Sequence, residues 1–262
     1  MSAGALPLAG RHAVVTGAGR GIGLAIARRL AADGATLTLL GRDGARLAAA
    51  ARGLGDACVA QAVCDVGDPA AVRSTFDAIA DAGRGVDILV NNAGIAASAK
   101  FAATDDALWA ETLRVNLTGV FLCTRAALPA LLAAPAGRIV NIASTAGLTG
   151  YPYVAAYCAA KHGVVGLTRA LAAELATTRV TVNAVCPGYT DTDIVAEAVS
   201  NIVAKTGRGE DAARAALAAR NPQGRLVTPE EVAAVVAWLA RADAQAITGQ
   251  ALPVAGGEVM AG

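Results

Sequence analysis

The chain has 262 residues, of which 55% are hydrophobic and 16% are charged. This length suits one α/β domain with a large core, and the composition excludes a chain that is disordered throughout. From the length we expect a single domain over 1–262. A net charge of +1 gives no sign of a nucleic-acid-binding surface, so we expect no nucleic-acid partner.

The five cysteines are odd in number and show no spacing typical of a zinc or redox site. We therefore expect reduced thiols in a cytoplasmic protein, and no metal. Residues 1–10 lack the basic and apolar regions of a signal peptide. The uncharged run 139–160 is long enough to raise the question of a membrane helix, but its polar residues, glycines and proline predict a buried strand, a loop and a helix start. We expect no membrane association.

Short apolar runs alternate with alanine-rich helical stretches along the chain. The expected strands are 12–16, 35–40, 59–64, 86–90, 138–143, 180–186 and 250–254. The expected helices are 21–33, 43–52, 69–82 and a long region 105–132, with another starting near Tyr157. Runs rich in Val, Ile and Leu suit strands buried on both faces. We predict an α/β fold: a single-domain, Rossmann-like, doubly wound parallel sheet of about seven strands with helices on both faces.

Residues 189–222 are polar and helical in tendency, and they lack strand signals. This segment is the least regular part of the chain. We predict that it forms a lid over the substrate.

A glycine-rich segment, 16–23, follows the first expected strand and opens the first expected helix. Its TGxxxGxG spacing differs from the common GxGxxG pattern, but its glycines would still let the backbone approach a pyrophosphate at the positive helix end. The alternative is a turn that serves packing only. The position between a strand and a helix favours the phosphate site.

The second expected strand ends in Gly41, Arg42 and Asp43. An enzyme that uses NAD often carries a carboxylate at this strand end for the ribose 2′-hydroxyl. Arg42 instead suits a 2′-phosphate through charge-assisted hydrogen bonds, and Arg20 could assist it. We predict NADP. The alternative, with NAD as cofactor, is that Arg42 is a solvated charge and Asp43 supplies the carboxylate.

Tyr157 and Lys161 are four residues apart, on one face of an expected helix. Free tyrosine has a pKa of about 10, and a nearby lysine cation should lower it. Tyr157 could then act as general acid in ketone reduction or as base in alcohol oxidation. Ser144 follows the strand 138–143 and could donate a hydrogen bond to the substrate oxygen. The Tyr–Lys spacing alone also fits an exposed, solvated pair; together with Ser144 and the glycine loop it indicates a proton-transfer site.

Taken together, these motifs resemble the short-chain dehydrogenase/reductase family over nearly the whole chain. The matching motifs are 16–23, Cys64-Asp65-Val66, Asn91-Asn92-Ala93-Gly94, Asn116, Ser144, Tyr157 with Lys161, and Pro187-Gly188. The resemblance implies an NAD(P)-dependent oxidoreductase that forms a homotetramer through its central helices. The catalytic residues that it implies are Asn116, Ser144, Tyr157 and Lys161. The cofactor-binding residues that it implies are Gly17, Gly19, Arg20, Gly21, Ile22, Gly23, Arg42, Asp65, Val66, Asn92, Ala93, Gly94, Tyr157, Lys161, Pro187, Gly188, Thr190 and Thr192.

The family's roles carry over position by position. Asp65 and the Val66 backbone would contact the adenine. The adenosine side would be lined, and the central sheet steadied, by Asn91, Ala93 and Gly94. Asn116 would hold a water that connects Lys161 to solvent, and Lys161 would also bind the nicotinamide ribose. The nicotinamide would pack against Pro187, Gly188, Thr190 and Thr192.

Within the family, segments 161–166, 182–188 and 221–225 resemble ketoreductases that act on 3-oxoacyl thioesters. The leading hypothesis is a 3-oxoacyl-thioester reductase, or a 3-hydroxyacyl-CoA dehydrogenase in reverse. Departures within 194–220 leave open a free cyclic or aryl ketone or secondary alcohol. Cations near the mouth of the lid, Lys205, Arg208 or Arg214, would suit a CoA phosphate. Two other classes are a non-catalytic dinucleotide-binding regulator and a nucleotide-sugar epimerase. The intact Ser–Tyr–Lys set argues against the first, and the chain length against the second.

Overall fold

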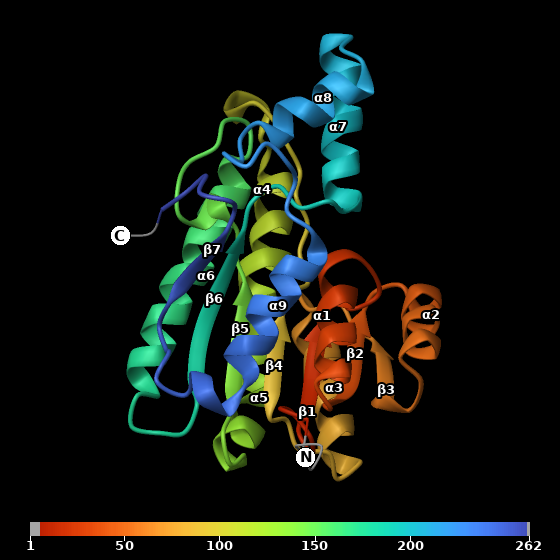
Figure 1. Ribbon diagram of the computed structural model, residues 1–262, viewed down its shortest axis with the longest axis vertical. Helices are drawn as coiled ribbons and strands as arrows, with labels where there is room; N and C mark the ends of the chain where they lie inside the picture. Colours follow the sequence, from red (N-terminus) through yellow and green to blue (C-terminus); the bar gives the residue numbers. More distant parts are fainter. Residues whose placement is uncertain (1–5, 261–262) are drawn as a thin grey trace, which may run out of the picture.

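The computed structural model describes residues 6–260 (Figure 1). Residues 1–5, and with them part of the segment in which no signal peptide is expected, lie outside the described residues, as do 261–262. Seven strands form one parallel sheet in the order β3-β2-β1-β4-β5-β6-β7. They are β1 (His12–Thr16), β2 (Thr36–Gly41), β3 (Cys58–Val63), β4 (Ile88–Asn91), β5 (Arg138–Ile142), β6 (Thr181–Pro187) and β7 (Ala251–Val254). The predicted doubly wound fold is confirmed.

Helices cover both faces of this sheet (Figure 1). One face carries α1 (Gly21–Ala32), α2 (Gly44–Leu54) and α9 (Pro229–Ala240), and the other carries α3 (Pro69–Asp81), α5 (Gly119–Ala133) and α6 (Ala155–Glu174). The remaining helices are α4 (Asp106–Leu113), α7 (Asp193–Thr206) and α8 (Glu210–Ala218). Short 3₁₀ turns occupy Gly55–Ala57, Phe101–Ala103, Thr145–Gly147 and Ala242–Ala244. In the view of Figure 1, α7 and α8 project beyond the upper end of the sheet.

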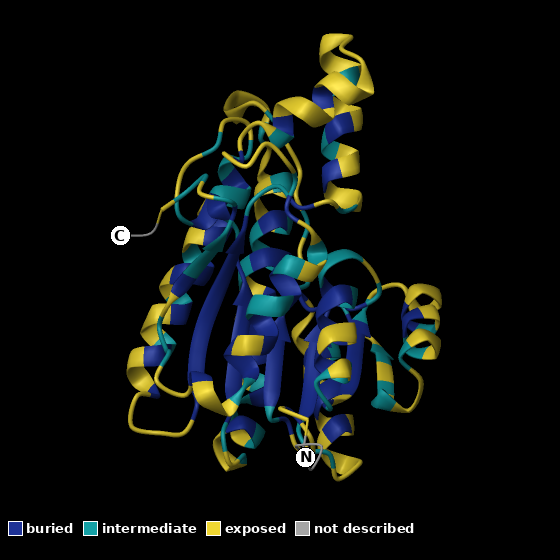
Figure 2. Ribbon diagram, viewed as in Figure 1, coloured by how far each residue is buried: buried dark blue, intermediate teal, exposed yellow. Residues whose placement is uncertain are grey.

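Successive residues of the inner strands are buried in opposite cores. Val15 packs under α1 and α9, whereas its neighbour Val14 packs under α3 and α5. Side chains alternate between the two faces of a strand, so a strand covered on both faces is a continuous apolar run. The inner strands are accordingly buried along their whole length in Figure 2. The edge strand β3 differs from the predicted buried strand, because alternate residues such as Val63, at 66% exposed, face solvent.

The expected helix over 105–132 is interrupted in the structure. Between α4 and α5 the chain forms a π-helical turn, Arg114–Thr118. Such a turn bonds each amide to the carbonyl five residues back and shifts the side-chain register of the helix. The apolar pattern on either side of the turn is helical, so the sequence predicts the helix without its interruption.

The continuous stretch Asp106–Ala133 is long and apolar enough, by length and composition, to cross a membrane, with a mean hydropathy of 1.5. Half of that window is buried, and α5 packs against α3 and the central strands, as a core helix does. The uncharged run 139–160 instead forms most of β5, a loop with a 3₁₀ turn, and the start of α6, as predicted.

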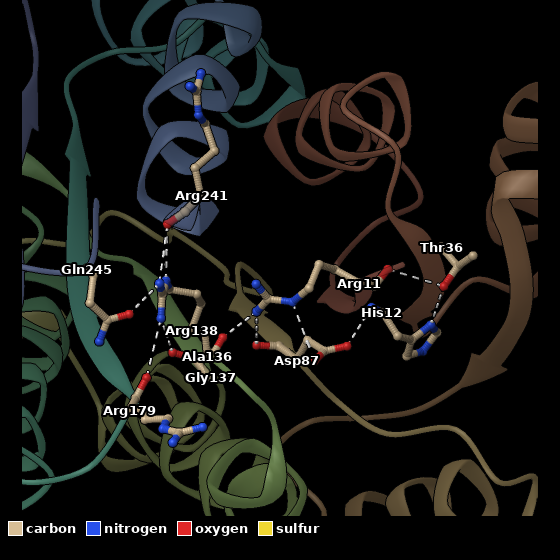
Figure 3. A network of polar contacts seen from close by, with 10 residues as sticks. All are labelled: Arg11, His12, Thr36, Asp87, Ala136, Gly137, Arg138, Arg179, Arg241 and Gln245. Carbon is tan, nitrogen blue, oxygen red and sulfur yellow. Dashed lines mark hydrogen bonds and ion pairs between the residues drawn. The ribbon is translucent and has the colours of Figure 1, made fainter. Parts of the chain in front are cut away.

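Polar contacts fasten the edge of the sheet where the strands begin (Figure 3). Arg138, at the start of β5, is fully buried, and its guanidinium donates to the Gln245 side chain at 2.7 Å. Asp87, just before β4, accepts from the His12 amide at 2.8 Å and pairs with Arg11. The Asp87 contacts join the starts of β1 and β4, and the Arg138 contact joins the start of β5 to the segment after α9. All of them lie at the opposite end of the sheet from the site described next.

Candidate active site

A cavity of about 1300 Å³ lies at the carboxyl ends of the parallel strands. Open α/β sheets bind their ligands at this edge, because the loops that leave the strands converge there. Its lining includes Gly17, Gly19, Arg20, Gly21, Ile22, Gly23, Arg42, Asp65, Val66, Asn92, Ala93, Gly94, Asn116, Ser144, Tyr157, Lys161, Pro187, Gly188, Thr190 and Thr192. The fold therefore brings every predicted catalytic and cofactor-binding position to one cavity.

Asn91 does not line the cavity, although it belongs to one of the matching motifs. Its side chain is buried, and Nδ2 donates to Thr124 Oγ1 and to Asn141 Oδ1, both at 2.9 Å. The structure thus places Asn91 away from the cavity, so the expected place on the adenosine side is wrong for this residue. Its bonds join β4, β5 and α5, which fits the expected role in steadying the sheet. The turn residue Asn92 faces the cavity in its place.

The glycine loop leaves the start of α1 uncovered. Gly17 and Gly21 have positive φ angles of 65° and 52°. A Cβ on Gly23 would lie only 2.2 Å from the Gly17 carbonyl oxygen, so only glycine fits there. Among the described residues, no side chain caps the first amides of α1. An open helix N-terminus fits the pyrophosphate of a dinucleotide, because its amides and its dipole favour an anion.

Thr16 fastens this loop to the turn after β4. Its buried Oγ1 accepts from the amides of Asn92 and Ala93 at 2.9 and 3.0 Å. Asn92 Nδ2 in turn donates to the carbonyls of Thr16 and Gly17 at 3.0 and 3.2 Å. Thr16 therefore acts as a structural part of the cofactor cradle; the sequence places it in the glycine motif but does not show this role.

Three arginines line the cavity near the end of β2: Arg20, Arg42 and Arg46. The sequence analysis missed Arg46, although its spacing of four from Arg42 was a usable signal. Asp43 caps α2 by accepting from the Arg46 amide at 3.0 Å, and its carboxylate pairs with Arg46 Nε at 3.2 Å. The carboxylate that could have bound a ribose hydroxyl is therefore engaged by its own helix.

Asp65 is held by the π-helical turn across the cavity wall. Its carboxylate accepts from Arg114 at 3.0 Å and from the Gly67 amide at 2.9 Å. Desolvation acts to raise the pKa of Asp65, but these two bonds outweigh it and keep that pKa below its usual range. Asp65 is therefore charged and oriented before any ligand binds.

Tyr157 and Lys161 share a face of α6 as predicted, but their electrostatics differ from the expectation. Burial raises the pKa of Tyr157 to about 12, while a hydrogen bond with Ser144 acts in the opposite direction. Lys161 Nζ lies 5.6 Å from the centre of the tyrosine ring and donates to the Ile142 carbonyl at 2.8 Å. The expected lowering of the tyrosine pKa by Lys161 is thus wrong here, because desolvation dominates. Tyr157 remains a protonated phenol at neutral pH.

Burial also changes Lys161. The loss of solvent lowers the pKa of its ammonium to about 8, because a charged group is costly in an apolar environment. Ser144, at the end of β5, accepts from the Ala146 amide at 3.1 Å. A hydroxyl that accepts one bond keeps its own proton to donate, so Ser144 can donate to the Tyr157 oxygen or, in its place, to a substrate oxygen.

Asn116 lies in the π-helical turn and is fully buried. Its Nδ2 donates to the carbonyls of Ile95 and Thr112, both at 2.9 Å. A Cβ on Gly94 would meet Asn116 Oδ1 at 2.8 Å and Lys161 Nζ at 3.8 Å, so these three residues adjoin one another. The turn therefore brings the Asn116 side chain to Gly94, which Lys161 also approaches.

Residues after β6 form the helical excursion that was predicted. It contains α7 and α8, and a bridge pairs Thr190 with Val227. Of the cations expected near its mouth, Lys205 lines the cavity, while Arg214 pairs with Asp191 at 2.7 Å. Within residues 6–260, no cluster of three or more His, Cys, Asp or Glu side chains could hold a metal ion.

Comparison with known proteins agrees with this geometry. A family model described as short chain dehydrogenase matches residues 11–202. The chain is 47% identical to the granaticin polyketide synthase putative ketoacyl reductase 1 of Streptomyces violaceoruber, over 94% of this chain and 92% of that one. It is 40% identical to the 3-oxoacyl-acyl-carrier-protein reductase of Vibrio cholerae, over 97% and 99%.

A solved structure shows the same fold. The crystal structure of an actinorhodin polyketide ketoreductase variant with NADPH superposes with a TM-score of 0.90 at 42% identity, covering 95% of this chain and 97% of that one. The family model and the relatives each span most of the chain, and the cavity holds the side chains that hydride transfer to a carbonyl requires. The chain therefore belongs to the short-chain dehydrogenase family, as an NAD(P)-dependent oxidoreductase.

Proposed function

We propose that the protein reduces the 3-oxo group of an acyl thioester to a 3-hydroxyl group, with NADPH as the cofactor. The observation that carries the proposal is the protonated Tyr157 phenol with Ser144 beside it, because reduction of a carbonyl needs a group that donates a proton to the developing alkoxide. The ketoacyl and 3-oxoacyl reductases among the relatives support the substrate class. In reverse, the same site oxidises a 3-hydroxyacyl thioester.

When bound, the reduced nicotinamide supplies a hydride to the carbonyl carbon. Ser144 donates a hydrogen bond to the carbonyl oxygen and so stabilises the negative charge that develops there. Tyr157 transfers its phenolic proton to that oxygen, which becomes the hydroxyl of the product. Lys161 stabilises the phenolate that is left, and a proton from solvent returns to it past Asn116.

The arginines at the end of β2 support NADP over NAD. Arg20, Arg42 and Arg46 line this part of the cavity, while the Asp43 carboxylate is occupied by Arg46. A 2′-phosphate offers such guanidinium groups a charged, bidentate partner.

The cofactor assignment is tested by Arg46→Ala. We expect the Kd for NADPH to rise roughly tenfold and the Kd for NADH to change less than about twofold. The substitution also removes the exposed ion pairs of Arg46 with Asp43 and Asp193, but only the 2′-phosphate contact distinguishes the two cofactors. Arg52→Ala, an exposed arginine farther along α2, is the matched control and should change neither. An equal loss of affinity for both cofactors would reject the 2′-phosphate contact.

The substrate assignment is tested by steady-state kinetics with NADPH. We expect kcat/KM for acetoacetyl-CoA to exceed that for free acetoacetate or for an aryl ketone such as α-tetralone. Rapid reduction of the aryl ketone together with no reduction of acetoacetyl-CoA would reject the thioester. Consumption of NADPH is the readout in all three reactions.

The proposal extends to location and assembly. All five cysteines are free thiols, which supports a reducing compartment and hence the cytoplasm.

Trp109 on α4 and Phe121 on α5 are 40% and 43% exposed, and large apolar side chains at a surface favour helix packing between subunits. We include a homotetramer in the proposal on this basis.

A further inference from the structure

Glu258, in the segment after β7, is a buried carboxylate that no motif of the sequence marks. Its side chain is only 7% exposed. Oε1 accepts from the Tyr151 hydroxyl at 2.7 Å and from Arg220 Nε at 3.3 Å. It thereby joins the end of the chain to the loop after β5 and to the segment after α8.

The two partners of Glu258 belong to one aromatic cluster. The Arg220 guanidinium carbon lies 4.7 Å from the centre of the Tyr151 ring. The Tyr189 ring meets the Tyr151 ring edge to face, with centroids 6.3 Å apart. Both tyrosines line the cavity, whereas the lining does not include Arg220 or Glu258. The Arg220–Glu258 ion pair therefore packs behind the rings of Tyr151 and Tyr189, which together form an aromatic wall of the cavity.

This wall lies close to Ser144, on the same side of the cavity as the proposed catalytic residues. The Tyr151 hydroxyl is 2.9 Å from Thr145 Oγ1, and Thr145 is the residue after Ser144. Tyr189 directly follows Pro187-Gly188 at the end of β6. Because the Tyr151 hydroxyl is hydrogen-bonded to Glu258, the ring of Tyr151, and not its hydroxyl, is available to a substrate. An aromatic ring can pack against an acyl chain.

The position of Glu258 is costly to maintain. Oε2 is buried and has no hydrogen-bond partner among the described residues. A Cβ on Gly188 would come within 3.0 Å of that oxygen, so the carboxylate fills the space directly behind the cavity wall. A buried carboxylate with an unsatisfied oxygen is destabilising, and a hydrophobic residue would avoid this cost.

We propose that Glu258 is a positioning residue that fixes the Tyr151–Tyr189 wall and so sets the affinity for the ketone substrate. This inference rests on the proposed function for the choice of substrate, but not for the contact itself. Glu258 acts through Tyr151 and Arg220 and does not itself line the cavity, although its Oε2 lies directly behind Gly188, a predicted nicotinamide contact. Its removal therefore affects substrate binding more than the hydride transfer step.

The test compares Glu258→Ala with Glu258→Gln in the full-length enzyme. For Glu258→Ala we expect the KM for acetoacetyl-CoA to rise about tenfold, with kcat within about threefold, since a charge-assisted hydrogen bond to Tyr151 is lost. The Kd for NADPH should stay unchanged. Glu258→Gln keeps an acceptor for Tyr151 but loses the charge that holds Arg220, so its KM should be intermediate. An unchanged KM in both variants, or an equal rise in the Kd for NADPH, would overturn the proposal.

Two further variants separate positioning from general destabilisation. Glu231→Gln removes another Arg–Glu pair, with Arg225 at 2.5 Å, which is more exposed than that of Glu258 and lies outside the cavity lining, and it should leave KM unchanged. Tyr151→Phe keeps the ring but loses the hydroxyl, and combining it with Glu258→Gln should raise KM less than the two single effects together. Fully additive effects would contradict the shared contact, and this comparison also serves if Glu258→Ala does not fold. If the wild-type enzyme reduces only another ketone, the thioester fails as substrate, and the same KM comparison with that ketone decides the role of Glu258.

Discussion

At the scale of single residues, burial decides the protonation of the catalytic groups. Tyr157 has a pKa raised to about 12, and Lys161 has one lowered to about 8, both chiefly because solvent is excluded. The two groups shift in opposite directions because desolvation favours the neutral form of each. Lys161, and not Tyr157, is therefore the member of the pair that changes charge near neutral pH.

Replacement of the phenol tests its role as proton donor. For Tyr157→Phe we expect turnover to fall by roughly 10²- to 10⁴-fold, which is the usual contribution of a general acid. The Kd for NADPH, measured by fluorescence titration, should change little because the ring remains. Cys158→Ala, at the next position, is the control and should retain turnover. Full turnover by Tyr157→Phe would reject the mechanism.

The pH dependence follows from Lys161. Its ammonium is present below its pKa of about 8 and is lost as the pH rises through that value. Because the cation stabilises the tyrosine phenolate, kcat/KM for the ketone, measured with NADPH, should be constant at lower pH. Above the pKa of Lys161 it should fall, approaching about tenfold per pH unit. In Lys161→Arg, which stays charged, any residual activity should lack this fall. A fall at the same pH in that variant would assign it to another group.

At the scale of elements, the π-helical turn Arg114–Thr118 links the fold to the site. It places Asn116 in the interior, where the side chain takes two backbone carbonyls as acceptors. The same turn directs Arg114 to Asp65 across the cavity wall. One local change of helical register therefore positions both Asn116 and the Arg114–Asp65 pair at the cavity.

Asn116→Leu tests this link. The substitution leaves the buried carbonyls of Ile95 and Thr112 without donors, which costs about 1–3 kcal/mol for each unsatisfied group. We expect a lower free energy of unfolding in urea and a lower turnover. Thr118→Ala, an exposed position in the same turn, is the control and should change neither. A denaturation midpoint equal to wild type would show that the turn does not depend on Asn116.

At the scale of the whole molecule, the end of the sheet where the strands begin and the end where they finish have different roles. Buried polar contacts such as Arg138 with Gln245 fix the edge where the strands begin. The opposite edge carries the cavity, the aromatic wall and the projecting helices α7 and α8 (Figure 1). Loops that leave buried, hydrogen-bonded strands can vary without loss of the core, and therefore suit a ligand site.

The proposed homotetramer is tested by light scattering coupled to size-exclusion chromatography. We expect a mass four times that of one chain. Phe121→Glu should lower this mass, because a charge on the exposed face of α5 opposes helix packing between subunits. Val63→Glu, on the exposed edge strand β3, should leave the mass unchanged. A monomeric wild type would reject the assembly.

Local patterns in the sequence determined the fold and most of the site. Continuous apolar runs predicted the parallel strands, because a strand buried on both faces needs them. Glycine spacing predicted the phosphate loop, and the four-residue spacing of Tyr157 and Lys161 placed both on one helix face. These features depend on residues close together in the chain, so a pattern can reveal them.

Tertiary structure alone decided the features that depend on distant residues. The raised pKa of Tyr157 comes from the packing around it, which the spacing to Lys161 does not show. Glu258 meets Tyr151 only because β7 returns the end of the chain to the site. The π-helical turn leaves the apolar pattern of its helix unchanged, so the sequence could name Asn116 but not its geometry. Burial and pairing are properties of the folded chain as a whole, and for this protein they set the charge of the catalytic groups and the wall that faces the substrate.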